Sequence, residues 1–365
     1  MSETSAASAK SALDTPALLI DLDVLEANIA HIAQTCRAHG VAWRPHFKGH
    51  KTLEIARKQL AAGAIGVTCA KLGEAEILAA GGIGDILIAN QIVGAVKIGR
   101  LMNLPDAADV VVALDACENI LELGEAARQS GKRLRVVIEV NTGMNRAGAE
   151  PGQPVVALAA AVAAHPNLRL VGVMGWEAHT AAIPDPAAKE KAVATAIGLL
   201  TASADLCRRA GHDIQIVSCG GTGTFLYCVK QPGVTEVQVG GAVMNDEHYR
   251  GHYNIDMPVA LTILATVTSR PTPTRVILDA GRKAMSIDTA APRALNIPGV
   301  RDLRLSAEHT LLELDAASDW PRVGDRIEFI PGYTDTTVHL HEEIVALRNG
   351  QVEAVWKVAG RGKIK

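Results

Sequence analysis

Eight short runs of apolar and β-branched residues recur between residues 41 and 239, and they constrain the fold more than any other feature of the chain. Most of them are separated by stretches rich in Ala, Leu and Glu with helical periodicity, such as Leu72–Ala80 and Pro154–Ala164. Strands that are apolar at nearly every position and alternate with helices are typical of a parallel sheet with both faces covered. Eight of them predict a closed (β/α)8 barrel, with an open doubly wound sheet as the alternative. The runs are Val41–Phe47, Gly66–Cys69, Asp85–Ala89, Val110–Leu114, Leu134–Val140, Leu170–Gly175, Ile214–Ser218 and Glu236–Val239.

The pattern changes after about Gly251, where strand signals follow one another without long helices between them. We therefore expect a barrel domain over residues 25–250 and a mainly β domain made of residues 15–24 and 251–365. The early segment belongs to the β domain because the run Ala17–Asp21 can add a strand to it. Residues 1–14 are expected to form a disordered tail, because the N-terminus is small and polar and lacks the apolar segment of a signal peptide. The C-terminal strand runs are Val259–Val267, Arg275–Asp279, Arg326–Ile330 and Val352–Lys357.

The composition bears on partners and compartment. The 36 basic and 39 acidic residues give a net charge of −3, so there is no electrostatic case for binding nucleic acid or an anionic membrane. The six cysteines are scattered without a CxxC pair, as expected of reduced thiols in a cytoplasmic protein. No apolar run is long enough to predict a helix that crosses a membrane. Only 3% of the residues are aromatic, so Ala, Val, Leu and Ile must supply most of the core.

A lysine stands at the end of the first predicted strand, in the segment Arg-Pro-His-Phe-Lys-Gly-His-Lys at residues 44–51. Residues at the carboxyl ends of barrel strands face the active site. A lysine that is withdrawn from water there can act as an amine nucleophile. Taken alone, however, Lys48 fits a solvated basic turn better.

Two glycine-rich loops favour a bound phosphate. The seventh run leads into Ser218–Thr224, with the sequence Ser-Cys-Gly-Gly-Thr-Gly-Thr, and the eighth leads into Gly240-Gly241-Ala242. Barrels often hold a phosphate between the loops after strands seven and eight, where glycine lets backbone N–H groups approach and hydroxyls add donors. Either loop alone fits an ordinary tight turn. Together, and without a lysine in either, they favour a fixed phosphate anchor over a nucleotide-binding loop.

Four segments carry a resemblance to a known family: Thr15–Asp23, the segment around Lys48, Asn141–Gly148 and Ser218–Thr224. Together they resemble the fold-type III enzymes that use pyridoxal 5′-phosphate (PLP) and have an alanine racemase-like N-terminal barrel. Within these enzymes the chain looks like the D-threonine aldolase and D-serine dehydratase family, over nearly all of residues 15–365. The resemblance implies PLP as the cofactor, a small D-amino acid as the substrate, and a homodimer.

The resemblance also implies roles for individual residues. Lys48 would hold the cofactor as a Schiff base, and Arg146 would face its phenolic oxygen. Gln238 stands where alanine racemases place an arginine opposite the pyridine nitrogen, although a strand polar group that is satisfied by other contacts is an equal alternative. His179 is expected to act as an acid or base at the substrate, with a structural histidine as the alternative. The phosphate cradle would consist of Ser218, Gly221, Thr222, Gly223, Gly240 and Gly241.

The segment Pro331–His341 departs from the family pattern, in which a His and an Asp or Cys bind a divalent metal beside the cofactor. Asp335 is kept, but the histidine position is Tyr333, whose phenol is a poor metal ligand until it loses its proton. Asp335 would bind Mn²⁺ or Mg²⁺ with waters, or with His339 or His341, which strand alternation places on the same face. Otherwise the site is free of metal and Tyr333 acts on the substrate hydroxyl, or the group is only a hydrogen-bonded network. We expect a metal at Asp335 and His339.

The reaction implied by the resemblance is that of a lyase. It would cleave a D-β-hydroxy-α-amino acid, D-threonine-like, to glycine and an aldehyde. β-Elimination, as in D-serine or 3-hydroxyaspartate dehydratases, is the alternative, although those enzymes more often carry His and Cys at the metal site. An amino-acid racemase is the third alternative. It ranks lower because alanine racemases carry a tyrosine base in a Tyr-Ala-Asp-Gly-type segment, which we do not find. A non-catalytic PLP carrier fits least, because such proteins lack the C-terminal β domain that is expected here.

Overall fold

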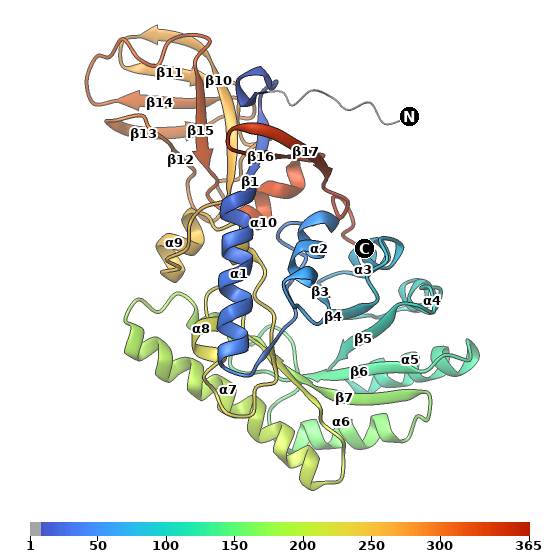
Figure 1. Ribbon diagram of the computed structural model, residues 1–365. Helices are drawn as coiled ribbons and strands as arrows, with labels where there is room; N and C mark the ends of the chain where they lie inside the picture. Colours follow the sequence, from blue (N-terminus) through green and yellow to red (C-terminus); the bar gives the residue numbers. More distant parts are fainter. Residues whose placement is uncertain (1–8) are drawn as a thin grey trace. The chain divides into compact units, whose positions relative to one another are not determined.

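The computed structural model describes residues 9–365, which divide into two compact units (Figure 1). The barrel unit consists of residues 30–48, 55–240 and 362–365. The β unit consists of residues 49–54, 241–361 and the described part of 1–29. Two helices of the chain, α1 (Leu22–Ala38) and α2 (Leu53–Ala61), begin in the β unit and end in the barrel unit. Each unit is described by itself below.

The barrel unit is built on a parallel eight-stranded sheet in the order β2-β9-β8-β7-β6-β5-β4-β3. A parallel bridge between His46 and Thr68 links the segment after β2 to β3, so the two ends of the sheet meet. The predicted (β/α)8 barrel is thereby confirmed, and the open sheet is excluded. The strands are β2 (Ala42–Trp43), β3 (Val67–Cys69), β4 (Asp85–Gln91), β5 (Asp109–Leu114), β6 (Leu134–Glu139), β7 (Leu168–Met174), β8 (Ile216–Cys219) and β9 (Glu236–Val237).

Aliphatic side chains from alternate strand positions fill the interior of the barrel, as the low aromatic content predicts. The central cluster consists of Leu87, Val111, Ala113, Val137, Val171 and Met174. Helices pack on the outer face, with α6 against β6 and β7 and α7 against β7 and β8 (Figure 1). The helices of this unit are α3 (Leu72–Ala80), α4 (Ala95–Met102), α5 (Cys117–Gln129), α6 (Gln153–Ala163), η2 (Ala178–Thr180), α7 (Pro186–Arg209) and α8 (Phe225–Cys228).

The β unit contains a nine-stranded sheet with the central order β13-β14-β11-β10-β1-β16-β17, to which β15 and β12 are added beside β10. The early strand β1 pairs with β10 and β16, as the sequence predicted for this segment. The strands are β1 (Ala17–Asp21), β10 (Leu261–Thr272), β11 (Arg275–Leu278), β12 (Arg293–Ala294), β13 (Val300–Leu305), β14 (Thr310–Leu314), β15 (Arg326–Ile330), β16 (Glu343–Arg348) and β17 (Gln351–Lys357). The helices are η1 (Lys10–Ala12), η3 (Gly241–Val243), α9 (Glu247–Tyr253), α10 (Thr334–Thr337) and η4 (Val338–Leu340).

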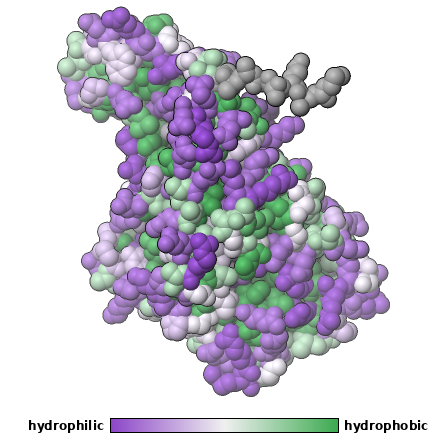
Figure 2. Space-filling model, in the orientation of Figure 1, coloured by the Kyte–Doolittle hydropathy of each residue, from purple (hydrophilic) through white to green (hydrophobic). Residues whose placement is uncertain are grey.

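The strands β13 and β17, which end the central strand order, carry exposed polar and charged side chains, such as Arg301 and Asp302 on β13 and Glu353 on β17. Such residues on an edge strand oppose pairing with another chain. Figure 2 shows hydrophilic residues over much of the surface of this unit on the face drawn there. Among residues 9–365, no helix is long and apolar enough to cross a membrane.

Two local predictions differ from the structure. Of the predicted tail 1–14, residues 1–8 lie outside the described residues, but Lys10–Ala12 form η1, and the Lys10 N–H donates to the Gly350 carbonyl. The segment after Pro331 is helical rather than extended. The Asp246 carboxylate explains this, because it accepts the backbone N–H of Thr334 at 2.7 Å and the Thr334 hydroxyl at 2.8 Å, and so caps α10 from a distant part of the chain.

Candidate functional site

Lys48 follows the barrel closure directly. The Phe47 N–H donates to the Thr68 carbonyl at 2.7 Å, which holds the backbone of this segment against β3. The half-buried Lys48 side chain places its amine 4.6 Å from the centre of the Trp176 ring, at the carboxyl end of β7. The lysine therefore lies at the carboxyl ends of the strands, where the sequence predicted a nucleophile.

Trp176 is the residue around which the predicted site residues of the barrel unit gather. Arg146 lies over the same ring, with its guanidinium carbon 5.0 Å from the ring centre. A Cβ added to Gly221 would lie only 2.8 Å from Trp176 Nε1, so the glycine-rich loop after β8 reaches this side chain too. Trp176 was not predicted as a site residue from the sequence. Its position directly after a strand, beside His179 in the Trp-Glu-Ala-His segment, was the available signal.

A buried carboxylate fixes Arg146. The Arg146 guanidinium lies 3.5 Å from Glu139 at the end of β6, whose side chain is 4% exposed. The other Glu139 oxygen accepts the Gln91 amide at 2.6 Å. A guanidinium that is held over an aromatic ring by a buried anion is preorganised to donate to an anionic oxygen. This arrangement supports the predicted role of Arg146 at the phenolic oxygen of the cofactor.

The loops after β8 and β9 are held closely together. Gln238 Nε2 donates to Ser218 Oγ at 2.9 Å, so these two predicted cofactor residues contact each other. Thr222 and Gly223 lie in the loop that follows Ser218 and the end of β8, and Thr222 is buried. Gly240 contacts the backbone of His46, where an added Cβ would overlap the carbonyl oxygen. Gly241 belongs to the β unit, where it packs against the Tyr249 ring.

His179 is exposed and lies beside the Asn141–Gly148 loop. A Cβ added to Gly143 would come within 3.0 Å of His179 Nε2, so the imidazole covers the backbone of this loop. The loop also carries Arg146. The structure therefore brings His179 to the same group of strand-end loops as Arg146, with its ring accessible to a small molecule.

In the β unit, Asp335 is surrounded by phenols. The Tyr249 hydroxyl donates to Asp335 Oδ1 at 3.2 Å, and the Tyr333 hydroxyl is hydrogen-bonded to both groups. The Tyr249 and Tyr333 rings meet edge to face with their centres 5.5 Å apart. Gly49, which follows Lys48 in the chain, is the third neighbour, since a Cβ there would lie 2.8 Å from Asp335 Oδ1.

These surroundings do not suit a divalent metal. Burial and the Asp335 carboxylate raise the pKa of Tyr333, so its phenol keeps its proton at neutral pH. His339 is exposed and directs Nδ1 at the backbone carbonyl of Asp335, 3.3 Å away, while His341 Nε2 is bound to the Ala284 carbonyl. Among residues 9–365, the one group of three His, Cys or acidic ligands close enough to share an ion does not contain Asp335. The metal at Asp335 and His339 stays a prediction.

The buried Asp246 beside this cluster gives a pH-dependent stability. Burial raises its pKa from 3.8 to about 7, so the folded protein keeps a proton there that the unfolded chain releases above about pH 4. The stability from this group is therefore complete below about pH 4 and is lost as the pH rises to about 7. Replacing Asp246 by Asn should flatten the fall in unfolding free energy over this window by about 1 kcal/mol or more. Urea unfolding at several pH values measures the unfolding free energy of the wild type and of Asp246→Asn. The same dependence of this free energy on pH in both proteins would contradict the assignment.

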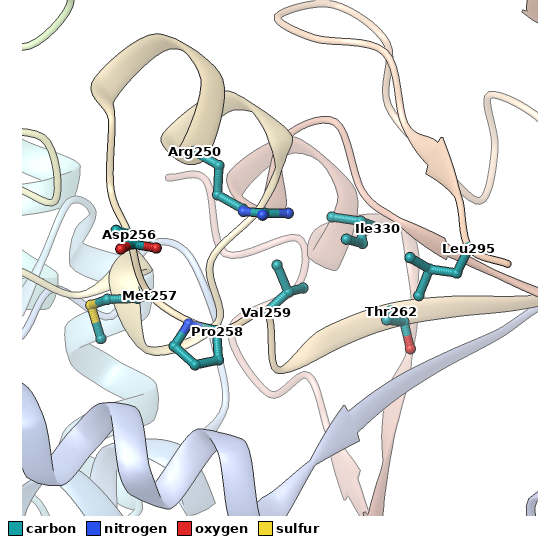
Figure 3. A pocket seen from close by; sticks show the side chains of 8 residues that line it. All are labelled: Arg250, Asp256, Met257, Pro258, Val259, Thr262, Leu295 and Ile330. Carbon is teal, nitrogen blue, oxygen red and sulfur yellow. The ribbon is translucent and has the colours of Figure 1, made fainter.

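Two cavities lie elsewhere. One of about 390 Å³ in the β unit is lined by apolar side chains together with Arg250, Asp256 and Thr262 (Figure 3). Arg250 extends towards its interior in Figure 3, but both charged residues are exposed. The other, of about 490 Å³, includes Asp109 and Leu134, the first residues of β5 and β6. It therefore lies at the amino ends of the strands, away from Lys48. Neither cavity contains a predicted site residue.

The barrel unit provides what PLP needs. Lys48 offers an amine that can bond to the aldehyde, Arg146 offers a cation that is already oriented, and the loop with Gly221 and Thr222 offers backbone N–H groups free of bulky side chains. The residues therefore fit this cofactor.

Comparisons with known proteins agree with this site. The family described as "Alanine racemase, N-terminal domain" matches residues 20–247, and "Putative serine dehydratase domain" matches residues 260–347. The chain is 33% identical to a D-threonine aldolase of Arthrobacter, over 96% of this chain and 93% of that protein. It is 35% identical to a 3-hydroxy-D-aspartate aldolase of Paracoccus denitrificans, over 97% and 94%.

A solved structure shows the same architecture. The crystal structure of D-threonine aldolase from Filomicrobium marinum matches with a TM-score of 0.93 at 34% identity, over 97% of this chain and 98% of that one. A D-threo-3-hydroxyaspartate dehydratase of Delftia is also similar, at 31% identity over 89% of this chain and 92% of that protein. The relatives therefore share the fold but not a single reaction.

Proposed function

The chain belongs to the alanine racemase-like family of PLP-dependent enzymes that includes D-threonine aldolases, and from this premise we propose that it is a lyase for D-β-hydroxy-α-amino acids. The substrate is D-threonine-like, and the products are glycine and an aldehyde. The observation that carries the proposal is the Lys48 amine over Trp176, beside Arg146, in a chain that matches two aldolases over nearly its whole length.

PLP, when bound, takes up the electron pair that the broken Cα–Cβ bond releases. Lys48 would hold the cofactor through its aldehyde, and its amine could carry protons near the substrate once it is free. Arg146 would face the phenolic oxygen, and Ser218, Thr222 and the glycines of both loops would hold the phosphate. Gln238, which donates to Ser218, orients this hydroxyl and offers the ring nitrogen a neutral partner.

A proton must leave the β-hydroxyl while its carbon becomes a carbonyl. We assign this proton to the Asp335 carboxylate, with His179 as a second proton carrier at the exposed side of the substrate. Tyr333 is not the base, because its raised pKa keeps the phenol protonated. The phenol instead donates to Asp335 or to the substrate oxygen and so orients the reacting pair. Gly49, the residue that follows Lys48 in the chain, is a neighbour of the Asp335 carboxylate, since a Cβ added there would lie 2.8 Å from Asp335 Oδ1.

This assignment predicts activity without a metal. Dialysis against EDTA should leave kcat/KM within about twofold of the untreated enzyme, because the nearest neighbours of Asp335 are phenols rather than metal ligands. Tyr333→Phe should lower kcat by about 100-fold while KM changes little. Tyr253→Phe is the matched control, because it removes the hydroxyl of a tyrosine whose ring neighbours that of Tyr249. Loss of activity on chelation and its return with Mn²⁺ or Mg²⁺ would instead support the metal at Asp335 and His339.

Product analysis decides between the reactions. The purified enzyme is incubated with D-threonine, D-phenylserine and D-3-hydroxyaspartate, and glycine, ammonia and 2-keto acids are quantified. Glycine from at least one substrate is expected. Ammonia with a 2-keto acid, and no glycine, would identify a dehydratase, the reaction of the Delftia relative. Loss of optical activity without either product would identify a racemase.

We also propose that the chain acts as a homodimer in the cytoplasm. The six cysteines, all within the described residues, form no disulfide, which suits a reducing compartment. Light scattering should give twice the mass of the 38.3 kDa chain, and cell fractionation should recover the activity in the cytoplasmic fraction. A monomer with full activity would contradict the first part.

A further inference from the structure

Glu177 is a fully buried carboxylate, 0% exposed, directly after Trp176. A buried carboxylate is costly unless hydrogen bonds replace the water that it loses. The hydrogen bonds that the structure shows for this side chain come from a single segment of the neighbouring strand's loop. Glu177 is therefore bound to the segment after β8, and the proposed reaction gives this carboxylate no role.

Three donors from this segment meet the two carboxylate oxygens. The Gly220 N–H donates to Oε2 at 3.4 Å, the Thr224 hydroxyl donates to Oε1, and the Cys228 thiol donates to Oε1 at 3.4 Å. Gly220 and Cys228 bracket the proposed cradle residues Gly221, Thr222 and Gly223. A single side chain thus connects the beginning of the loop, its last residue Thr224 and the end of the short helix α8 that follows.

The backbone of the loop shows why such a tie is needed. Gly220 adopts a φ of +75°, which only glycine reaches without strain, and a Cβ there would lie 3.2 Å from the Cys228 Cβ. The chain therefore turns back on itself between these residues. Loops rich in glycine have much conformational freedom to lose. The hydrogen bonds to Glu177 remove that freedom before any ligand binds, and preorganisation of this kind raises affinity.

We propose that Glu177 is a positioning residue for the cofactor phosphate, which acts by holding the segment Gly220–Cys228, the loop after β8 together with α8, in its binding conformation. The inference rests on the phosphate cradle proposed above. It does not depend on the reaction, because cofactor binding is measured without substrate.

The same side chains offer a competing explanation. Ligand atoms of Glu177, Cys219 and Cys228 lie within 4.8 Å of one another, as in a binding site for a thiophilic metal. The hydrogen bonds favour the positioning role, because both carboxylate oxygens are already engaged by the loop. Elemental analysis of the purified holoenzyme separates the two. Less than 0.1 equivalent, on the order of background, supports the proposal, whereas about one equivalent of zinc that is lost in Cys219→Ser would overturn it.

The direct test compares two cofactors that differ only in the phosphate. Dissociation constants of PLP and of pyridoxal are measured by absorbance titration of the wild type and of Glu177→Gln, after removal of the cofactor by dialysis. Gln keeps the shape but places an amide donor against the loop donors. PLP affinity should fall about tenfold or more, while pyridoxal affinity changes less than about twofold. The readout is the dissociation constant of PLP divided by that of pyridoxal, which should rise in Glu177→Gln. A general loss of structure would weaken the binding of both ligands alike and would leave this ratio unchanged.

Two further variants keep the test decisive. Glu236→Gln removes another buried carboxylate of the same unit, one that pairs with Arg44 at 3.0 Å, and should lower thermal stability without changing the ratio. Should Glu177→Gln fail to fold, Thr224→Val removes one of the three donors to Glu177. This variant should also bind PLP more weakly and raise the ratio of the PLP constant to the pyridoxal constant by about threefold. An unchanged ratio in the folded variants would overturn the proposal.

Discussion

Replacing Lys48 by Ala is expected to lower kcat/KM for the cleaved D-amino acid by about 10⁴-fold or more, the largest effect of any single change. In the function proposed above, the amine of Lys48 is the group that would bond to the cofactor aldehyde, and alanine offers no amine in its place. The Trp176 ring, 4.6 Å away, holds the amine in place but offers no nucleophile of its own. The visible absorbance of the protein-bound cofactor should change with the loss of the Schiff base.

The fold should survive this change, because Lys48 is only half-buried and its backbone is held by the hydrogen bond from Phe47 to Thr68. Thermal unfolding of Lys48→Ala and of Lys97→Ala, an exposed lysine on α4, should differ from that of the wild type by only a few degrees, in line with a cost below about 1 kcal/mol. Activity of Lys48→Ala within tenfold of the wild type would remove Lys48 from the mechanism.

Replacing Gly240 by Ala is expected to cost the barrel unit about 2–4 kcal/mol of unfolding free energy and most of its affinity for PLP. The added Cβ would overlap the carbonyl oxygen of His46 and would lie 2.8 Å from the His46 nitrogen, both of which are backbone atoms. The His46 N–H also donates to the Gln238 carbonyl at 3.1 Å, so the segments around His46 and Gly240 cannot separate without losing this hydrogen bond. The segment with Lys48 would move as a consequence.

Gly99→Ala provides the matched control. Gly99 lies on α4 of the same unit, and an added Cβ there meets nothing within 4 Å. Alanine inside a helix should therefore raise the unfolding free energy by about 0.5–1 kcal/mol. Guanidinium unfolding monitored by circular dichroism measures both variants. A Gly240→Ala variant as stable as the wild type would show that the contact between these two strand ends can relax.

The barrel could be predicted from the sequence because each of its strands is recognisable from its own short run of apolar residues. The run Val110–Leu114 is buried on both faces, and a short run that is apolar at every position is typical of a strand in a parallel sheet covered on both faces. Short strands at the sheet edges, such as β12 and β13, were missed, because their exposed polar residues give no such signal. The segment around Asp335 was expected to alternate as a strand, but the Asp246 carboxylate caps a helix there, and this contact spans 88 positions of the chain.

The candidate site shows the same division. Lys48 and the glycine loops were predicted from local patterns of a few neighbouring residues, and Arg146 from the family resemblance of the segment Asn141–Gly148. Trp176 and Glu177 were not, because their importance comes from contacts with other strands' loops, which local patterns do not contain. The phenols around Asp335 are another case, since Tyr249 lies far from Tyr333 in the sequence and meets it only in the folded β unit.

The central claim is that this chain cleaves the Cα–Cβ bond of D-β-hydroxy-α-amino acids with PLP. The most direct test is to incubate the holoenzyme with D-threonine or L-threonine and to quantify glycine and acetaldehyde together, with Lys48→Ala as the blank. The account predicts equal amounts of the two products from D-threonine and none from L-threonine. Equal cleavage of both enantiomers would contradict it, and so would consumption of D-threonine with release of ammonia in place of glycine.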